Sequence, residues 1–202
     1  GALIEPLAVG FHAAKQGGAK AGQTAVVFGA GCIGLVSMMA LKACGVSRVY
    51  VVDIMEKRLE KALELGADGV INGKEVDIIE KAKELTGGEG FDLAVETAGT
   101  EITTNQAIQA VRKGSNIVLV GYGKTGMMNL MMSLALDKEV TFKTVFRYRH
   151  IYPMAIDAVE QGKVNLKGIA THIFDFDDIQ TAMDRSVNEK AEIVKAVVKI
   201  AK

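Results

Sequence analysis

A glycine-rich turn between two different hydrophobic patterns most constrains how this chain folds. The segment Gly29-Ala30-Gly31-Cys32-Ile33-Gly34 follows a β-type run at residues 24–28 and precedes an apolar helical pattern. A second β-type run at residues 48–52 leads directly to Asp53. This is the dinucleotide-binding fingerprint in the context that it requires, because the glycines lie between a strand and a helix. The sequence therefore predicts a Rossmann-type unit that binds a dinucleotide.

Each glycine of the turn has a separate physical task. Gly29 permits a tight turn, Gly31 lets the backbone approach a pyrophosphate, and Gly34 lets the helix pack closely on the strand. The N–H groups and the dipole at the start of the helix then face the phosphate charge. A glycine turn without a ligand is the alternative interpretation, and the flanking strand and helix argue against it.

Asp53 indicates which dinucleotide is bound. A carboxylate at this point accepts hydrogen bonds from the adenosine ribose hydroxyls and repels a 2′-phosphate, which favours NAD over NADP. Arg58 follows in the next helical pattern, where an arginine can serve a phosphate, stack near the adenine or lie on the surface. Asp53 is also a good helix N-cap, and that role is compatible with cofactor binding.

Strands and helices alternate over the first three quarters of the chain. β-type runs occur at 24–28, 48–52, 69–71, 91–96, 116–120 and 140–145, and helices are predicted at 7–16, 33–44, 56–65, 75–85, 103–111 and 130–136. Such alternation predicts an α/β fold, a doubly wound parallel sheet of six strands in the order 3-2-1-4-5-6. The helix at 56–65 is expected to point Leu59, Ala62, Leu63 and Leu65 inward.

The pattern changes after Phe146. Helices are predicted at 153–161 and 177–187, with β-type runs at 171–174 and 193–200. This tail is not another Rossmann unit, because it does not repeat the strand and helix order of the first part.

Composition excludes several classes of partner. The 202 residues include 24 basic and 24 acidic ones, so no net charge favours nucleic acid or a membrane surface. No apolar run approaches the ~20 residues of a membrane span, and no signal peptide is visible. Cys32 and Cys44 form no disulfide framework, which favours a cytoplasmic location.

Two strand ends mark the carboxyl edge of the predicted sheet, where open α/β sheets bind ligands. Val120-Gly121-Tyr122 closes the fifth strand, so we expect the nicotinamide near it. Glu96 closes the fourth strand, and we interpret it as a hydrogen-bonded carboxylate rather than a catalytic group.

The sequence contains no self-contained metal site. Oxidation of an alcohol by hydride transfer needs a group that takes the proton, and a Lewis-acid metal or a polarising dyad usually does so. His12, His150 and His172 lie far apart in the sequence, and the cysteines lack a CxxC arrangement. We interpret each histidine as a core or surface residue.

Two further segments are distinctive. One is Glu5-Pro6-Leu7-Ala8-Val9-Gly10, and the other is Val145-Phe146-Arg147-Tyr148 followed by Tyr152-Pro153-Met154-Ala155-Ile156. Together with the glycine turn, they make the whole chain resemble the cofactor-binding half of zinc-type medium-chain alcohol dehydrogenases, in the sorbitol (polyol) dehydrogenase branch. Without the resemblance, Glu5 would be an ordinary helix-entry carboxylate and Arg147-Tyr148 a surface pair.

The resemblance implies a role for each matching position. Glu5 would contact a zinc-bound water or the substrate, and Arg147 and Tyr148 would hydrogen-bond the polyol. The positions that match nicotinamide contacts are Val120, Gly121, Tyr122, Val145 and Phe146. Those that match pyrophosphate and adenosine contacts are Ile33, Asp53 and Arg58, with Cys32 at a loop position where the family commonly has Pro or Val.

The resemblance also implies a division of the chain. The family's principal zinc ligands lie in an N-terminal catalytic domain that this sequence lacks. We expect an NAD-binding domain at 1–150, in which 1–20 form a helix that links to the catalytic domain. Residues 151–202 would belong partly to that domain, so an exposed apolar face is expected there.

The implied activity is NAD- and zinc-dependent oxidation of a secondary alcohol of a polyol, sorbitol or xylitol, to the ketose. The chain alone would be inactive. An L-threonine or 2,3-butanediol dehydrogenase and a non-catalytic dinucleotide-binding module are the alternatives. The family forms homodimers or homotetramers by joining sheet edges, and the run at 140–145 is the candidate edge.

Overall fold

A six-stranded parallel sheet forms the centre of the computed structural model, which describes residues 1–123 and 125–200. The strands are β1 (Thr24–Phe28), β2 (Arg48–Asp53), β3 (Gly69–Asn72), β4 (Phe91–Glu96), β5 (Val111–Leu119) and β6 (Thr141–Thr144). Their order is β3-β2-β1-β4-β5-β6, and every pairing is parallel. The predicted α/β class and strand order are therefore confirmed.

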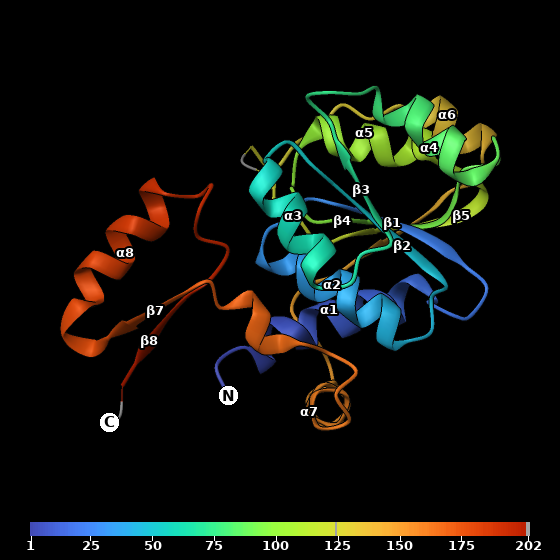
Figure 1. Cartoon of the computed structure of the whole chain (residues 1–202). Helices are drawn as coiled ribbons and strands as arrows, with labels where there is room; N and C mark the ends of the chain where they lie inside the picture. The colour runs from blue at the N-terminus through green and yellow to red at the C-terminus, as the bar shows by residue number, and fades with distance from the viewer. Residues whose placement is uncertain (124, 201–202) are drawn as a thin grey trace.

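Helices cover both faces of this sheet (Figure 1). One face carries α1 (Ile4–Gly17), α2 (Cys32–Ala43) and α3 (Glu56–Glu64), and the other carries α4 (Ile78–Thr86), α5 (Glu101–Ala110) and α6 (Met132–Asp137). A separate cluster of buried apolar side chains lies on each face. Because both faces of the sheet are covered, the strands carry apolar side chains on both sides, as is usual in parallel sheets.

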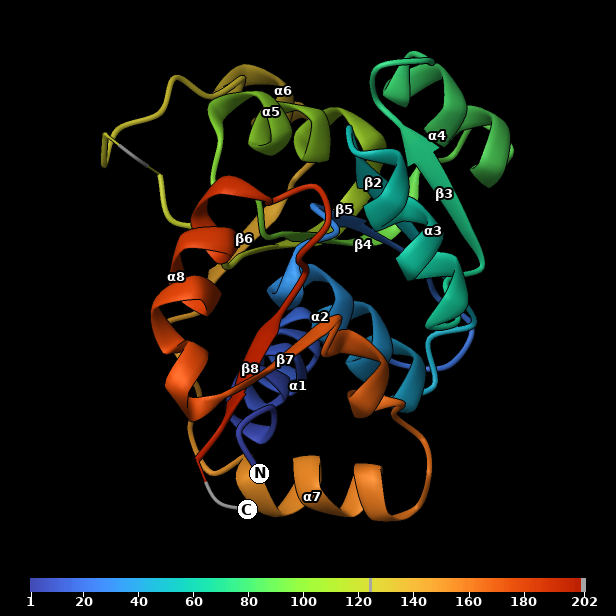
Figure 2. The same cartoon turned by 60° about the vertical axis from the view of Figure 1, so that its left-hand side comes forward.

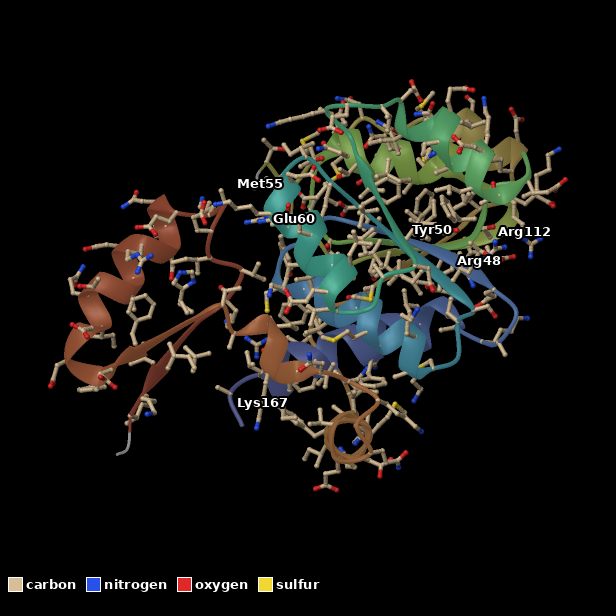
Figure 3. The ribbon with its side chains drawn as sticks, in the orientation of Figure 1. Arg48, Tyr50, Met55, Glu60, Arg112 and Lys167 are labelled. Atoms are coloured by element: carbon tan, nitrogen blue, oxygen red, sulfur yellow. The ribbon has the colours of Figure 1, made fainter. Side chains whose placement is uncertain are left out.

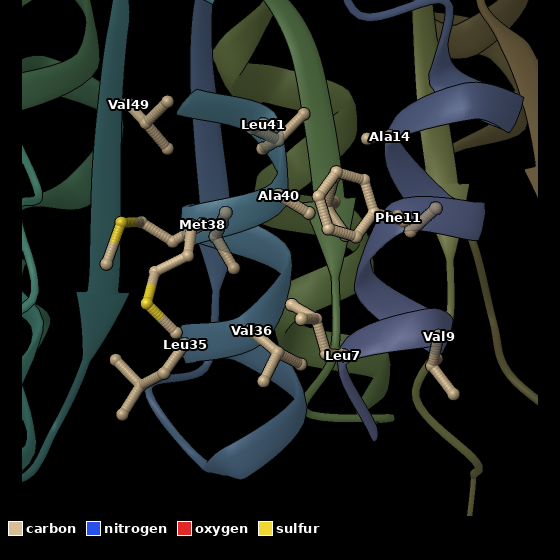
Figure 4. Close-up of a cluster of buried hydrophobic side chains, with 14 of the residues drawn as sticks. Leu7, Val9, Phe11, Ala14, Leu35, Val36, Met38, Ala40, Leu41 and Val49 are labelled. Atoms are coloured by element: carbon tan, nitrogen blue, oxygen red, sulfur yellow. The ribbon is translucent and has the colours of Figure 1, made fainter. Parts of the chain in front are cut away.

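α1 packs closely on α2, and Gly10 makes this contact possible. A Cβ atom at Gly10 would lie 2.6 Å from the carbonyl oxygen of Val36. Figure 4 shows Leu7 and Phe11 of α1 facing the α2 helix. Both side chains are at most 2% exposed, so α1 is an integral part of the core rather than a loose linker.

Several sequence-based boundaries and one burial prediction differ from the structure, and three of these differences follow from identifiable contacts or geometry. Leu63 is 48% exposed, so the prediction that it points inward was wrong. Leu59 and Ala62 define the buried stripe of α3, and Leu63 lies about 100° further round the helix. α4 begins at Ile78 rather than at 75, because the Asp77 side chain accepts hydrogen bonds from the backbone N–H groups of Ile79 and Glu80. β5 begins at Val111 rather than at 116, through an irregular stretch opposite the start of β4.

The tail forms two further parts. α7 (Tyr152–Glu160) packs on α1, and a 3-10 turn, η1 (Leu166–Ile169), follows it. β7 (His172–Asp175) and β8 (Ala196–Lys199) then pair in parallel, with η2 (Phe176–Asp178) and α8 (Ile179–Asn188) between them. Figure 1 shows this small β–α–β unit to one side of the large sheet, and in Figure 2 it lies in front of α1 and α2.

The β7–α8–β8 unit carries an exposed apolar face, as expected for the tail. Its exposed residues are Ile173, Phe176, Ile179, Met183 and Val187, each at least 44% accessible. Single exposed apolar residues are ordinary, whereas several on one small unit mark a surface for contact with other protein atoms. Among the described residues, no helix is both long and apolar enough to cross a membrane.

His12 is the buried titratable group of α1. Its side chain is 6% exposed, and its Nδ1 atom has no hydrogen-bond partner among the described residues. Burial lowers the pKa of His12 below the ordinary value of 6.5, and the positive charges of Arg149 and Lys15 lower it further. His12 is therefore neutral in the folded chain at neutral pH.

This histidine should make stability depend on pH. The folded pKa is depressed, so the unfolded chain takes up a proton first, and the stabilisation present above pH 6.5 is lost as the pH falls below it. Urea unfolding across this range should show a falling free energy of unfolding. The substitution His12→Leu should flatten that slope, and an unchanged slope in the variant would refute the assignment.

Candidate functional site

The glycine turn joins β1 to α2 with backbone atoms in close contact. Gly29 has a φ of +97°, which favours glycine, and its N–H donates to the carbonyl oxygen of Val52 at 2.8 Å. A Cβ atom at Gly34 would overlap the carbonyl oxygen of Gly29. At Gly31 the nearest heavy atom to such a Cβ would be Arg58 Nη1, at 3.9 Å. Gly34 is therefore required for packing, whereas Gly31 leaves space above the turn.

The first turn of α2 is open to an anion. Gly31 is the N-cap residue and offers no side-chain cap, so the leading N–H groups of α2, from Cys32 and Ile33 onward, have no capping side chain. Burial raises the pKa of the Cys32 thiol, so it lines the turn as a neutral group. The positive charge of Lys195 acts in the opposite direction, so Lys195 lies within electrostatic range of this thiol. Because Lys195 is far from Cys32 in the sequence, no motif or spacing could have predicted this effect.

Asp53 is held beside the glycine turn by three backbone donors. Its Oδ2 accepts from the N–H of Ala30 at 2.6 Å, and its Oδ1 accepts from Ile54 and Met55 at 2.7 and 3.0 Å. The N-cap of α3 is Met55, so the considered N-cap role for Asp53 was wrong. The carboxylate thus has a fixed position at the end of β2.

A pocket of about 360 Å³ lies next to Asp53. Its apolar lining includes Val52, Ile54, Ala98 and Ile102. A mostly apolar hollow with one fixed carboxylate suits a flat aromatic ring attached to a hydroxyl-bearing sugar.

Arg58 ties α3 to the segment that follows α8. Its Nε and Nη2 atoms donate to the carbonyl oxygen of Lys190 at 3.2 and 2.7 Å. The neighbouring Lys57 forms an ion pair with Glu192. The structure gives Arg58 a role that the sequence spacing does not reveal. Its side chain links α3 to a segment that is distant in the sequence.

Glu96 organises the end of β4. The side chain is fully buried, and its Oε1 accepts from the N–H groups of Ala98 and Gly99, both at 2.9 Å, and from Thr103 Oγ1 at 2.8 Å. Burial raises the pKa of Glu96, and these three hydrogen bonds oppose the rise. With its acceptors satisfied, Glu96 is a structural carboxylate, as the sequence predicted.

The nicotinamide-side segments meet at this same edge. The N–H groups of Val120 and Gly121 both donate to the backbone oxygen of Glu96, at 2.8 and 3.0 Å. The N–H of Val145 donates to the carbonyl oxygen of Leu119 at 3.0 Å. These bonds place residues 120–122 beside residues 145–147.

Two aromatic rings mark this edge. Tyr122 and Phe146 are 78% and 70% exposed, and their rings meet edge to face at 6.5 Å. The guanidinium of Arg147 lies 5.3 Å from the centre of the Phe146 ring. In Figure 3, Arg48 and Arg112 mark the opposite end of the strands, and Met55 marks the end that faces α8.

The charge of Glu5 reaches Tyr148, although Glu5 is far from Arg147 and Tyr148 in the sequence. Glu5 is exposed in the first turn of α1, and Tyr148 packs against the core cluster that includes α1. A hydrogen bond with Tyr152 is the main cause that raises the pKa of Tyr148 to about 12, and the charge of Glu5 also contributes. The charge of Arg147 also acts on Tyr148, in the opposite direction, so both charged groups lie within electrostatic range of this phenol.

Tyr152 belongs to the same site and had no predicted role. Its Oη lies 2.9 Å from Tyr148 Oη. As for a metal, the described residues contain no group of three or more His, Cys, Asp or Glu side chains that gathers around one point.

The surroundings of Gly34 and Gly31 predict different effects of an alanine at each position, one on stability and one on NAD binding. Gly34→Ala should prevent the close contact of α2 with β1 and lower the thermal unfolding midpoint by several degrees, because backbone atoms cannot move aside. Gly31→Ala should fold normally and lower the affinity for NAD at least about tenfold, because the added methyl group enters the space above the turn. Calorimetry of unfolding and of NAD titration checks both. Equal losses of stability in the two variants would contradict the assignment.

Comparison with known proteins shows to which family the chain belongs. Residues 32–161 match the family model described as zinc-binding dehydrogenase. The zinc-type alcohol dehydrogenase-like protein YdjJ of Escherichia coli is 43% identical over 100% of this chain and 57% of its own length. Sorbitol dehydrogenase of Bacillus subtilis is 35% identical over 98% of this chain and 56% of its own length.

A solved structure gives the same result. The crystal structure of 2R,3R-butanediol dehydrogenase from Bacillus subtilis has a TM-score of 0.92 and 31% identity, over 100% of this chain and 57% of that one. This chain thus spans a little over half the length of these relatives. With a family match over well more than half of its residues, the chain belongs to the zinc-binding dehydrogenase family.

Proposed function

We propose that this chain is the NAD-binding part of a zinc-dependent dehydrogenase that oxidises a secondary alcohol of a polyol, sorbitol or xylitol, to the ketose. The observation that supports this most is the position of Arg147 on the Phe146 ring, beside Tyr122, together with the charges of Glu5 and Arg147 that act on Tyr148. A carboxylate, a guanidinium and a phenol at one place offer both donors and acceptors to a substrate with several hydroxyl groups.

The cofactor would lie along the carboxyl edge of the sheet. Asp53 would accept the ribose hydroxyls, and its negative charge disfavours the 2′-phosphate of NADP. The pyrophosphate would lie on the glycine turn and on the N–H groups of α2, with Lys195 as an added positive charge. The nicotinamide would contact residues 120–122, Val145 and Phe146.

Arg58 would support the adenosine end of this site. Its guanidinium lies within reach of the space above Gly31 while it holds the backbone at Lys190. Arg58 would thus keep the segment that contains Lys195 next to the bound pyrophosphate.

Residues 1–123 and 125–200 do not supply a complete zinc site. Of the proposed site residues, Glu5 is the one carboxylate near the substrate position, and a catalytic zinc takes three protein ligands. We place the zinc ligands outside this sequence, in the catalytic domain expected from the resemblance. The isolated chain would bind NAD without turning over an alcohol.

The division of the chain follows the same proposal. Residues 1–150 would form the NAD-binding domain, and residues 151–202 would join the catalytic domain. The exposed apolar face of the β7–α8–β8 unit would pack on that domain. The two unpaired cysteines accord with a cytoplasmic enzyme.

A second candidate substrate is 2,3-butanediol, because the structural similarity to a 2R,3R-butanediol dehydrogenase covers the whole chain. L-threonine, a third candidate, rests on the glycine turn and the Glu5-Pro6 segment alone. The Phe146-Arg147-Tyr148 run favours the polyols. A non-catalytic dinucleotide-binding module remains the candidate from a different functional class.

Turnover by the full-length, zinc-loaded enzyme tests the proposal. NAD reduction should be faster with sorbitol or xylitol than with 2,3-butanediol or L-threonine, and NADP should be a poorer cofactor because of Asp53. Arg147→Gln should lower kcat/KM for the polyols at least about tenfold, through loss of a charge-assisted hydrogen bond.

Arg112→Gln is the matched control for this test. Arg112 pairs with Asp92 at the opposite end of the strands, so its loss should leave kcat/KM unchanged (Figure 3). A preference for butanediol or threonine would reject the polyol assignment, and a lack of any turnover would favour the binding module.

The free edge of the sheet supports an oligomer. β6 pairs with β5 on one side, and its residues Thr141, Lys143 and Thr144 are exposed. Open strand edges invite pairing with another chain, and two copies of β6 would extend the sheet into a homodimer or, with a second contact, a homotetramer. Light scattering should give at least twice the monomer mass of 21.5 kDa, and a clean monomer would contradict the proposal.

A further inference from the structure

Two phenols face each other beside the proposed substrate position. The Oη atoms of Tyr148 and Tyr152 lie 2.9 Å apart, and the rings meet edge to face, with 5.0 Å between centres and 83° between planes. This distance is that of a good hydrogen bond, and the ring geometry is the favoured one for an aromatic pair. The two side chains therefore act as a unit.

The backbone is shaped to bring them together. Arg147 and His150 have φ values of 58° and 54°, in the left-handed region that residues other than glycine seldom adopt. Ile151 is 1% exposed and anchors the end of this tight loop in the core. Tyr152 then opens α7, whose second residue is Pro153. A loop held in this conformation fixes where both phenols point.

α7 places the pair next to α1. The two helices pack on each other, and Glu5 lies in the first turn of α1. The charge of Glu5 and that of Arg147 both act on Tyr148. Tyr152 is 39% exposed, so the pair borders solvent, where a substrate arrives, rather than being enclosed in the core.

We infer that Tyr152 is a positioning residue, which holds the Tyr148 phenol through the Oη–Oη hydrogen bond and makes the pair a binding point for a non-reacting hydroxyl of the substrate. This inference rests on the proposed function for the class of substrate, although the Tyr148–Tyr152 bond itself does not.

The chemistry of two phenols suits a hydroxyl rather than a charged group. One phenol donates to the other, which leaves one O–H and several lone pairs for a third hydroxyl. Because the pKa of Tyr148 is raised to about 12, the phenol stays protonated at neutral pH and is not a base for the reaction. A polyol has hydroxyls beyond the reacting carbon that can use this point, whereas a simple secondary alcohol such as 2-propanol has none.

The test compares Tyr152→Phe with Tyr50→Phe in the full-length, zinc-loaded enzyme. Both changes remove one phenol oxygen, but Tyr50 lies in β2 against Phe91, far from the tail (Figure 3). Tyr152→Phe should raise KM for sorbitol or xylitol about three- to tenfold, with a smaller change in kcat, because one neutral hydrogen bond is lost. Tyr152→Phe should not change the turnover of 2-propanol. Tyr50→Phe should change the kinetics with neither the polyol nor 2-propanol.

Fluorine NMR of the 3-fluorotyrosine-labelled enzyme tests the bond without turnover. The Tyr148 resonance, assigned by its loss in Tyr148→Phe, should shift in Tyr152→Phe and stay in place in Tyr50→Phe. An unshifted resonance would overturn the inference, as would an equal loss of activity with polyols and with 2-propanol. An enzyme that oxidises no polyol would contradict the proposed function, while the resonance shift would still decide whether Tyr152 holds Tyr148.

Discussion

The contact between the backbone of Gly29 and the Cα of Gly34 is the constraint on which the rest of the molecule depends. It brings the start of α2 directly onto the end of β1, and no side chain can intervene there. α2 can then lie flat on the sheet, and α1 can lie on α2 because Gly10 also lacks a side chain. Two backbone contacts thus set the spacing of β1, α2 and α1, and through α1 they determine where Glu5 lies. Stability and the position of a proposed catalytic residue have the same physical origin.

Much of the fold was predictable because its determinants are local. A strand, a glycine turn and a helix follow one another within residues 24–44, and repeated alternation leaves few topologies for a parallel sheet. The boundaries were less predictable, because they depend on single capping bonds such as the one that Asp77 makes. The burial of Leu63 was misjudged because an apolar residue beside a buried stripe does not reveal how wide that stripe is.

The candidate site divides in the same way. The residues at strand ends, Asp53, Glu96 and Val120, were found from their positions, since parallel strands end at one edge. The contacts of Arg58 with Lys190 and of Tyr148 with Tyr152, and the effect of the Lys195 charge on Cys32, were not. Each depends on how the tail folds back or how one tight loop turns, and neither feature has a periodic pattern. Glu5 and Arg147 were identified through the family resemblance, because spacing alone does not join residues so far apart.

The link from Arg58 to the tail has a consequence for how such a chain tolerates change. The acceptor is the main-chain oxygen of residue 190, and every amino acid supplies that atom. Position 190 is therefore free to vary without loss of the link, while its partner must keep a long side chain with several donors at fixed angles. The tail can therefore change in sequence at this position and still dock on α3. Selection acts on the Arg58 end of the bond only.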